Sequence, residues 1–174
     1  MKKVIQPTNT EIVLQDDDII VSKTDLKGRL TYCNQTFCQI SRYRESELLG
    51  QPHNIIRHPD MPRAVFKLLW DTLAQGREIF AYVKNMASNG DYYWVFAHVT
   101  PSYDKHHNVI GYHSNRRCPD RDVLANTIVP LYASVLREEN QHSNGKQALA
   151  ASSDLLVNVL KSKNVSYDEL IFSL

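Results

Sequence analysis

The sequence predicts an α+β fold: a five-stranded antiparallel sheet with helices on one face, followed by a C-terminal helical extension. Two short strand patterns open the chain, an amphipathic helical pattern lies in the middle, and three strand patterns follow. Strands joined by short turns pair antiparallel, and a helical insert between them packs on one face of the sheet. We therefore divide the chain into an N-terminal cap (1–18), a sheet domain (19–118) and a helical extension (119–174).

The first strand pair is predicted from composition. Residues 19–24 form a β-branched run that stops at a turn ending in Gly28, and residues 29–33 resume the alternation. Asn34 then follows, and its side-chain oxygen suits the N-cap of a short helix. For residues 1–18 we expect either an irregular cap or a short amphipathic helix.

The long helix and the last three strands are predicted from periodicity. Apolar residues recur at helical spacing over 61–75, and Gly76 follows the segment. Residues 78–84, 92–101 and 109–116 then read as strands. The sheet and the long helix are expected to enclose a pocket between them.

The connector before the long helix, residues 50–62, reads GQPHNIIRHPDMP. Its prolines restrict the backbone and remove hydrogen-bond donors, so the segment is not one uninterrupted helix. Two interpretations remain: a proline-rich turn that only caps the next helix, or a shaped loop that carries a binding site.

Composition narrows the class of protein. The formal net charge of the 174 residues is +1, which gives no basis for nucleic-acid binding. Three cysteines without a Cys-x-x-Cys motif do not indicate a disulfide framework and suit a reducing compartment. No apolar run is long enough for a signal peptide or a membrane span, so we expect a cytoplasmic protein.

Specific motifs over about residues 15–118 resemble the PAS domain, and in particular the flavin-binding PAS module of bacterial aerotaxis receptors. The residues that carry the resemblance are Thr24-Asp25-Leu26 with the Gly28 turn, Asn34-Gln35-Thr36-Phe37, Gly50-Gln51-Pro52-His53-Asn54, Arg57-His58-Pro59-Asp60-Met61-Pro62, Val83-Lys84-Asn85 and Asn89-Gly90-Asp91-Tyr92-Tyr93-Trp94. The resemblance implies the PAS fold and a non-covalently bound FAD, with the ring buried in the pocket. The cofactor-binding residues that we then expect are Asn34, Arg57, His58, Asp60, Trp70, Asn85 and Tyr93.

The chemistry of these side chains suits a flavin, although each also has a purely structural interpretation. Arg57 can donate two hydrogen bonds to a phosphate or a carbonyl oxygen, or it can form an ion pair with Asp60 at the surface. Asn34 and Asn85 each offer a donor and an acceptor to a ring edge, or they serve a helix cap and a strand end. Trp70 can wall the ring or belong to the core.

The remaining predicted ligands also have alternatives. Tyr93 can wall the ring, and His58 can bond to the ligand or only start the helix. Asp60 can act in the site or cap the long helix.

Two positions depart from flavin-binding relatives. Those relatives usually carry Trp near position 79, where this chain has Ile79 followed by Phe80. Either Phe80 or another aromatic residue stacks on the flavin, or the ring is held less tightly. Light-sensing relatives have a cysteine where this chain has His53, so a cysteinyl photocycle is not expected. A haem-binding gas sensor is an alternative, with His58, His98 or His113 as axial ligand.

The C-terminal extension has two helical patterns, 119–140 with Pro130 interrupting it, and 147–161. Their apolar stripes either pack on the same domain or form a dimer or partner interface. The sequence holds no kinase, cyclase or metal-dependent phosphodiesterase motif, so we expect no enzyme activity. The prediction is a stand-alone FAD-binding redox or oxygen sensor of the aerotaxis type. We expect a homodimer, formed through the N-terminal cap or the C-terminal helices, that contacts a downstream signalling protein. The competing class is a cofactor-free interaction module.

Overall fold

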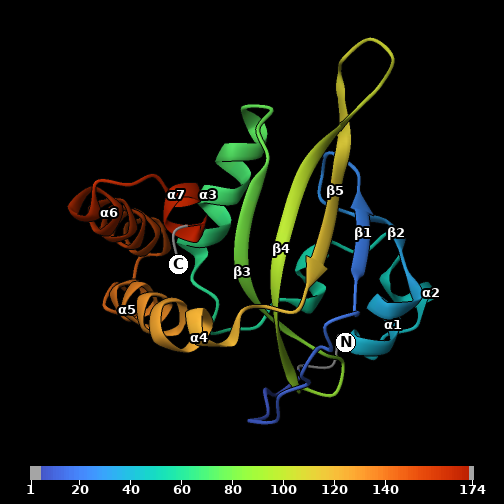
Figure 1. Cartoon of the computed structure of the whole chain (residues 1–174), viewed down its shortest axis with the longest axis horizontal. Helices are drawn as coiled ribbons and strands as arrows, with labels where there is room; N and C mark the ends of the chain where they lie inside the picture. Colours follow the sequence, from blue (N-terminus) through green and yellow to red (C-terminus); the bar gives the residue numbers. More distant parts are fainter. Residues whose placement is uncertain (1–4, 173–174) are drawn as a thin grey trace.

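A computed structural model describes residues 5–172 and shows a five-stranded sheet, with the helices between its second and third strands on one face (Figure 1). The strands are β1 Ile20–Thr24, β2 Leu30–Cys33, β3 Ile79–Met86, β4 Tyr92–Tyr103 and β5 Val109–Arg117. The helices are α1 Gln35–Ser41, α2 Glu45–Leu48, α3 Arg63–Ala74, α4 Arg121–Val123, α5 Val129–Asn140, α6 Gly145–Lys163 and α7 Tyr167–Phe172. No helix among the described residues is long and apolar enough to cross a membrane.

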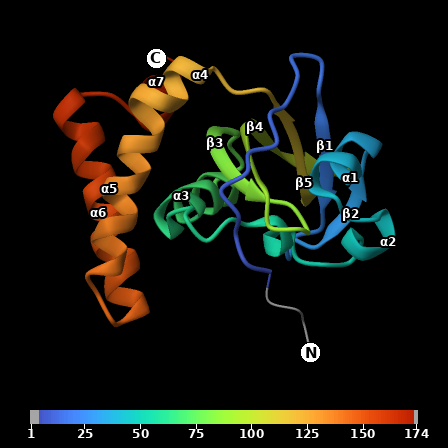
Figure 2. The same cartoon turned by 90° about the horizontal axis from the view of Figure 1, so that it is seen from below.

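The sheet has the strand order β2-β1-β5-β4-β3, and every neighbouring pair is antiparallel. The first and last thirds of the domain therefore meet at its centre, where β1 pairs with β5. The segment between β2 and β3 lies on one face of the sheet, including a 3-10 turn, His53–Ile56, in the proline-rich connector (Figure 2). The predicted fold class is confirmed.

The N-terminal segment 5–18 contains no helix, so the helical alternative for the cap is wrong. The segment runs extended beside the start of β4: Thr8 donates its amide to the Gly90 carbonyl at 2.8 Å, and Ile12 donates to the Tyr92 carbonyl at 2.7 Å. Backbone partners on β4 replace the internal hydrogen bonds that a helix would have supplied. Leu14 is buried, which anchors the segment to the core.

The C-terminal extension begins with α4 and a π-helical turn, Leu124–Ile128, and continues as α5. Pro130 lies in the first turn of α5, where its missing amide is tolerated. The wide turn directly before it marks the predicted interruption of the helix.

The helices α5 and α6 pack on this chain's own domain, beside α3 (Figure 2). Their contact is centred on buried Ala64 of α3, Val135 of α5 and Leu156 of α6. The Tyr132 hydroxyl of α5 also donates to the Tyr82 carbonyl of β3 at 2.8 Å. Of the two interpretations of these helices, packing on the same domain is the one that the structure shows, and it covers the edge strand β3.

Candidate functional site

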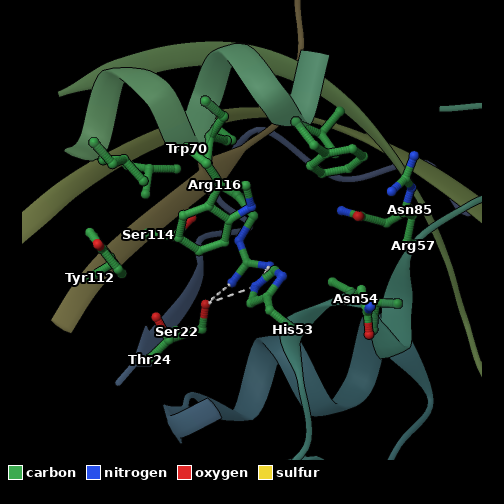
Figure 3. A pocket seen from close by; sticks show the side chains of 17 residues that line it. Ser22, Thr24, His53, Asn54, Arg57, Trp70, Asn85, Tyr112, Ser114 and Arg116 are labelled. Carbon is green, nitrogen blue, oxygen red and sulfur yellow. Dashed lines mark hydrogen bonds between the residues drawn. The ribbon is translucent and has the colours of Figure 1, made fainter. Parts of the chain in front are cut away.

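A cavity of about 210 Å³ lies between α3 and the inner face of the sheet (Figure 3). Its apolar walls come mainly from α3 and β3–β4, and its polar groups from β1, β5 and the connector. The lining residues are Ser22, Thr24, His53, Asn54, Ile56, Arg57, Phe66, Leu69, Trp70, Leu73, Val83, Asn85, Ala97, Val99, Tyr112, Ser114 and Arg116. Three predicted ligands, Arg57, Trp70 and Asn85, are among them.

Trp70 and Tyr112 form one end of the cavity. Their rings meet edge to face with centroids 5.4 Å apart, and Trp70 is 41% exposed. Trp70 is therefore neither a plain core residue nor a surface residue: one part of the indole lines the cavity and another meets solvent. An aromatic wall of this kind suits a flat ring.

Arg57 and Asn85 lie at the opposite end, where their backbones form a bridge between the connector and β3. The Arg57 guanidinium donates to the Met61 carbonyl at 3.0 Å and lies 4.3 Å from the centre of the Phe66 ring. Burial lowers the pKa of Arg57. The expected alternative, a surface pair with Asp60, does not form, because Asp60 accepts a hydrogen bond from Lys84 at 2.8 Å.

Unpaired polar atoms surround the cavity. Asn85 is 4% exposed, and its Nδ2 has no hydrogen-bond partner among the described residues. The same holds for Thr24 Oγ1 and Arg116 Nε, which also belong to the cavity lining. Because buried polar groups are almost always paired, three orphaned atoms around one hollow fit a polar-edged ligand that would pair with them. The residues present therefore suit the mixed donor and acceptor edge of a flavin ring.

Arg116 is the main site residue that the sequence interpretation missed. It is 2% exposed and donates to Ser22 Oγ and to His53 Nε2 (3.3 Å) (Figure 3). Its guanidinium also lies 4.7 Å from the centre of the Phe37 ring. Burial lowers the pKa of Arg116 to about 10. Burial and the neighbouring Arg116 charge lower the pKa of His53 to about 3, so His53 is neutral near pH 7.

A signal for Arg116 was present in the sequence. Alternation along β5 places Tyr112, Ser114 and Arg116 on one face and His113 and Asn115 on the other. Because Arg116 lies on the same face of β5 as Tyr112, which lines the cavity, the alternation predicts that the Arg116 side chain also points into the cavity.

Asn34 does not line the cavity. Its Oδ1 accepts from the Phe37 amide at 3.0 Å as the N-cap of α1, and also from the Val21 amide at 3.0 Å. Its Nδ2 donates to the Ile19 carbonyl at 2.7 Å. The capping alternative is thus the one observed, with an added connection to β1.

His58, Asp60 and Tyr93 are also outside the lining. The ring Nδ1 of buried His58 accepts from the Asp60 amide at 3.1 Å, while its Nε2 has no partner among the described residues. Asp60 does not cap α3, since the residue before that helix is Pro62 and no side chain of the connector caps it. Tyr93 is fully buried beside Asn85 in the β3–β4 register, so it supports the cavity from behind its lining.

Phe80 faces away from the cavity, so of the alternatives given for an aromatic partner of the ring, the structure does not favour Phe80. It stacks on His98 at 4.1 Å and meets Phe172 of α7 at 4.7 Å, on the opposite face of the sheet. The reason is the period of two: Ile79 is buried on the inner side, and Phe80 therefore points outward. The aromatic residues of the cavity are Phe66, Trp70 and Tyr112.

The three histidines considered as haem ligands are dispersed. None of His58, His98 and His113 belongs to the cavity lining. His98 instead pairs with Glu78 at 2.7 Å, and His113 contacts Asn115 at 3.3 Å on the outer face. This arrangement does not favour the haem alternative.

The comparison with known families agrees with the geometry. A family model described as the PAS fold matches residues 30–116, which is half of the chain. The chain belongs to the PAS family. Over 129 residues it is 43% identical to the aerotaxis receptor of Escherichia coli (strain K12), with 74% of this chain and 25% of that receptor covered. It is also 28% identical to the nitrogen fixation regulatory protein of Klebsiella pneumoniae, over 51% of this chain and 18% of that protein. The chain thus matches about a quarter or less of the length of these relatives.

Solved structures with the same fold include light-oxygen-voltage (LOV) domains. The dark structure of the blue-light photoreceptor Aureochrome1 LOV superposes with a TM-score of 0.54 at 21% identity, covering 70% of this PAS chain and 84% of that one. An RNA-binding light-oxygen-voltage receptor gives a TM-score of 0.58 at 18% identity, covering 68% and 35%. At this identity the likeness establishes the shared fold.

Proposed function

We propose that this PAS protein binds FAD non-covalently and senses redox state or oxygen, as a sensor module of the aerotaxis type. The observation that carries the proposal is the set of orphaned polar atoms around the cavity beneath α3. A cofactor-free interaction module would fill such a hollow with side chains and pair its buried polar groups. The 43% identity to an aerotaxis receptor supports the same conclusion.

The size of the cavity suits part of an FAD molecule. At about 210 Å³, it is smaller than the roughly 300–1,000 Å³ typical of pockets that enclose a whole ligand. A flat ring would occupy the cavity, and the remainder of the cofactor would extend beyond it. Arg57 lines both this cavity and a second hollow that includes Arg63, which suits it to hold the phosphates between the two.

In the proposed mechanism, the flavin supplies electron transfer and this chain's residues report the change. The Asn85 amide would hold the edge of the ring, and because it offers both a donor and an acceptor, it would pair with either protonation state of that edge. Asn85 lies on β3, three residues from Tyr82, whose carbonyl accepts from Tyr132 of α5. A shift of β3 therefore reaches the C-terminal helices through one strand. Such a switch requires the two conformations to differ in affinity for the two redox states.

The proposal also covers the cellular location of the protein and its partners. We place the protein in the cytoplasm, because Cys33, Cys38 and Cys118 are free thiols in the structure. Signalling proceeds through protein contacts and not through catalysis, with a homodimer and a downstream protein as the contacting species. Exposed aromatic side chains, such as Tyr32 of β2 and Phe172 of α7, are available for such contacts.

The test is the visible spectrum of the purified protein, followed by titration with FAD and FMN. We expect flavin absorbance, and preference for FAD. Asn85→Ala should weaken flavin binding about tenfold, because a net hydrogen bond contributes about 1 kcal/mol or slightly more. Arg57→Ala should weaken FAD binding more than FMN binding, as Arg57 is proposed to hold the second phosphate.

The matched control is Asn115→Ala, an asparagine on the opposite face of the same sheet. Equal flavin affinity of Asn85→Ala and Asn115→Ala would show that the cavity is not the binding site. A Soret band would establish haem, and a colourless protein that refuses added flavin would establish the interaction module.

A further inference from the structure

The most unusual group in the cavity is the Arg116 guanidinium. It is buried, and among the described residues it forms no ion pair with a carboxylate. Its two observed acceptors, Ser22 Oγ and His53 Nε2, are neutral, and its Nε has no partner. The guanidinium has five hydrogens to donate, so its capacity is incompletely used.

The titratable groups that face Arg116 are also neutral near pH 7. They come from each element packed around it: Cys33 from β2, His53 from the connector and Tyr93 from β4. Burial raises the pKa of Cys33 to about 12 and raises that of Tyr93, while burial lowers the pKa of His53. Arg116 is therefore an uncompensated positive charge at the floor of the cavity, in addition to Arg57 at its rim.

A buried charge without a partner is strongly unfavourable unless a ligand supplies the opposite charge. Arginine remains protonated even when burial lowers its pKa to about 10. The floor of the cavity, where Arg116 meets Ser22 and His53, is thus built to accept negative charge from whatever binds there (Figure 3).

We propose that Arg116 makes the cavity prefer the reduced, negatively charged form of the flavin ring over the oxidised, neutral form. This inference rests on the proposed function. In the step concerned, two electrons and one proton enter the ring, so the net charge of the ring falls by one, and the guanidinium balances that charge. The electrons come from an external low-potential reductant, for which dithionite serves in the experiment. Arg116 accordingly raises the midpoint potential of the bound flavin.

The first test uses the unaltered protein. Each proton taken up in a two-electron reduction contributes about 30 mV per pH unit to the midpoint potential. We expect a slope of about 30 mV per pH unit between about pH 6 and pH 8, because only one proton accompanies the two electrons. A slope of about 59 mV per pH unit would mean that the reduced ring is neutral, which overturns the inference.

The second test removes the charge. Arg116→Gln should lower the midpoint potential by about 30 mV for every tenfold loss of preference for the reduced form, and we expect at least one such factor of ten. Arg116→Lys retains a positive charge, so its midpoint potential should stay close to that of the unaltered protein. The matched control is Arg117→Gln, the next residue on β5, which is exposed on the other face.

The outcomes separate this inference from the proposed function. If the unaltered protein binds no flavin, the proposed function itself fails. If Arg116→Gln folds, binds flavin and has the potential of the Arg117→Gln control, flavin binding stands and the role of Arg116 is refuted. If Arg116→Gln does not fold, as judged by circular dichroism, a slope of about 59 mV per pH unit in the unaltered protein still overturns the inference, and Arg116→Lys replaces Arg116→Gln in the comparison with Arg117→Gln.

Discussion

Glu139 of α5 connects the C-terminal helices to the helix that roofs the cavity, and its removal should destabilise the protein. The carboxylate is 6% exposed and accepts from three donors: the Ala64 amide at 3.0 Å, Arg63 Nε at 3.2 Å and Ser152 Oγ at 3.2 Å. Ala64 lies in the first turn of α3, which lacks a capping side chain of its own. Glu139 thus caps α3 from another helix, and its negative charge complements the helix dipole.

The magnitude follows from these contacts. Loss of one member of a buried ion pair costs about 3–5 kcal/mol, and a hydrogen bond to a charged group contributes about 1.5–3 kcal/mol. The Arg63 contact is discounted, because 41% of that side chain is exposed. We therefore expect Glu139→Ala to lower the free energy of unfolding by about 3 kcal/mol. For a domain of this size that corresponds to a fall in Tm of about 6–12 °C.

The assay is urea and thermal unfolding followed by circular dichroism, with Glu138→Ala as the matched control. Glu138 is the preceding residue, is half-buried and pairs with His142 at 3.2 Å, so its removal should cost less than about 1 kcal/mol. Glu139→Gln keeps an acceptor oxygen and should fall between the two. If Glu139→Ala and Glu138→Ala unfold at the same urea concentration, then α5 is not seated on α3 in solution, and the route from β3 to the C-terminal helices loses its support.

Two further predictions concern the N-terminal segment and pH. Gly90→Ala should detach residues 5–18 and increase their cleavage in limited proteolysis, because Gly90 has φ +94° and an added Cβ would lie 2.1 Å from the Gln6 carbonyl oxygen; an unchanged cleavage pattern would argue against that pairing. His53 has a pKa of about 3 in the folded protein against an ordinary 6.5, so between these values the unfolded chain binds the extra proton. Stability should therefore fall as pH drops from about 6.5 towards 3, by up to about 1.4 kcal/mol per pH unit. His53→Gln should reduce this slope in urea titrations, whereas His106→Gln, an exposed control, should not; equal slopes would refute the neutral state of His53.

Local sequence determined the elements of this protein and part of its site. Alternation of apolar residues specified the strands, and helical spacing before Gly76 specified α3, because these periods follow from backbone geometry alone. Arg57 and Asn85 lie in the motifs that carry the resemblance, Trp70 lies in the helical pattern, and the structure brings all three to the cavity.

Tertiary structure decided which polar groups meet and which way they face. Ser22, His53 and Arg116 converge from β1, the connector and β5, although Ser22 and Arg116 are 94 residues apart in the sequence. Their convergence depends on the strand order that places β1 beside β5, and no local pattern encodes strand order. The two-residue period of β3 puts Ile79 and Phe80 on opposite faces, but which of these faces meets the cavity depends on how the sheet packs against α3. The elements are fixed by short-range backbone preferences, whereas the charge in the cavity results from long-range pairing of strands.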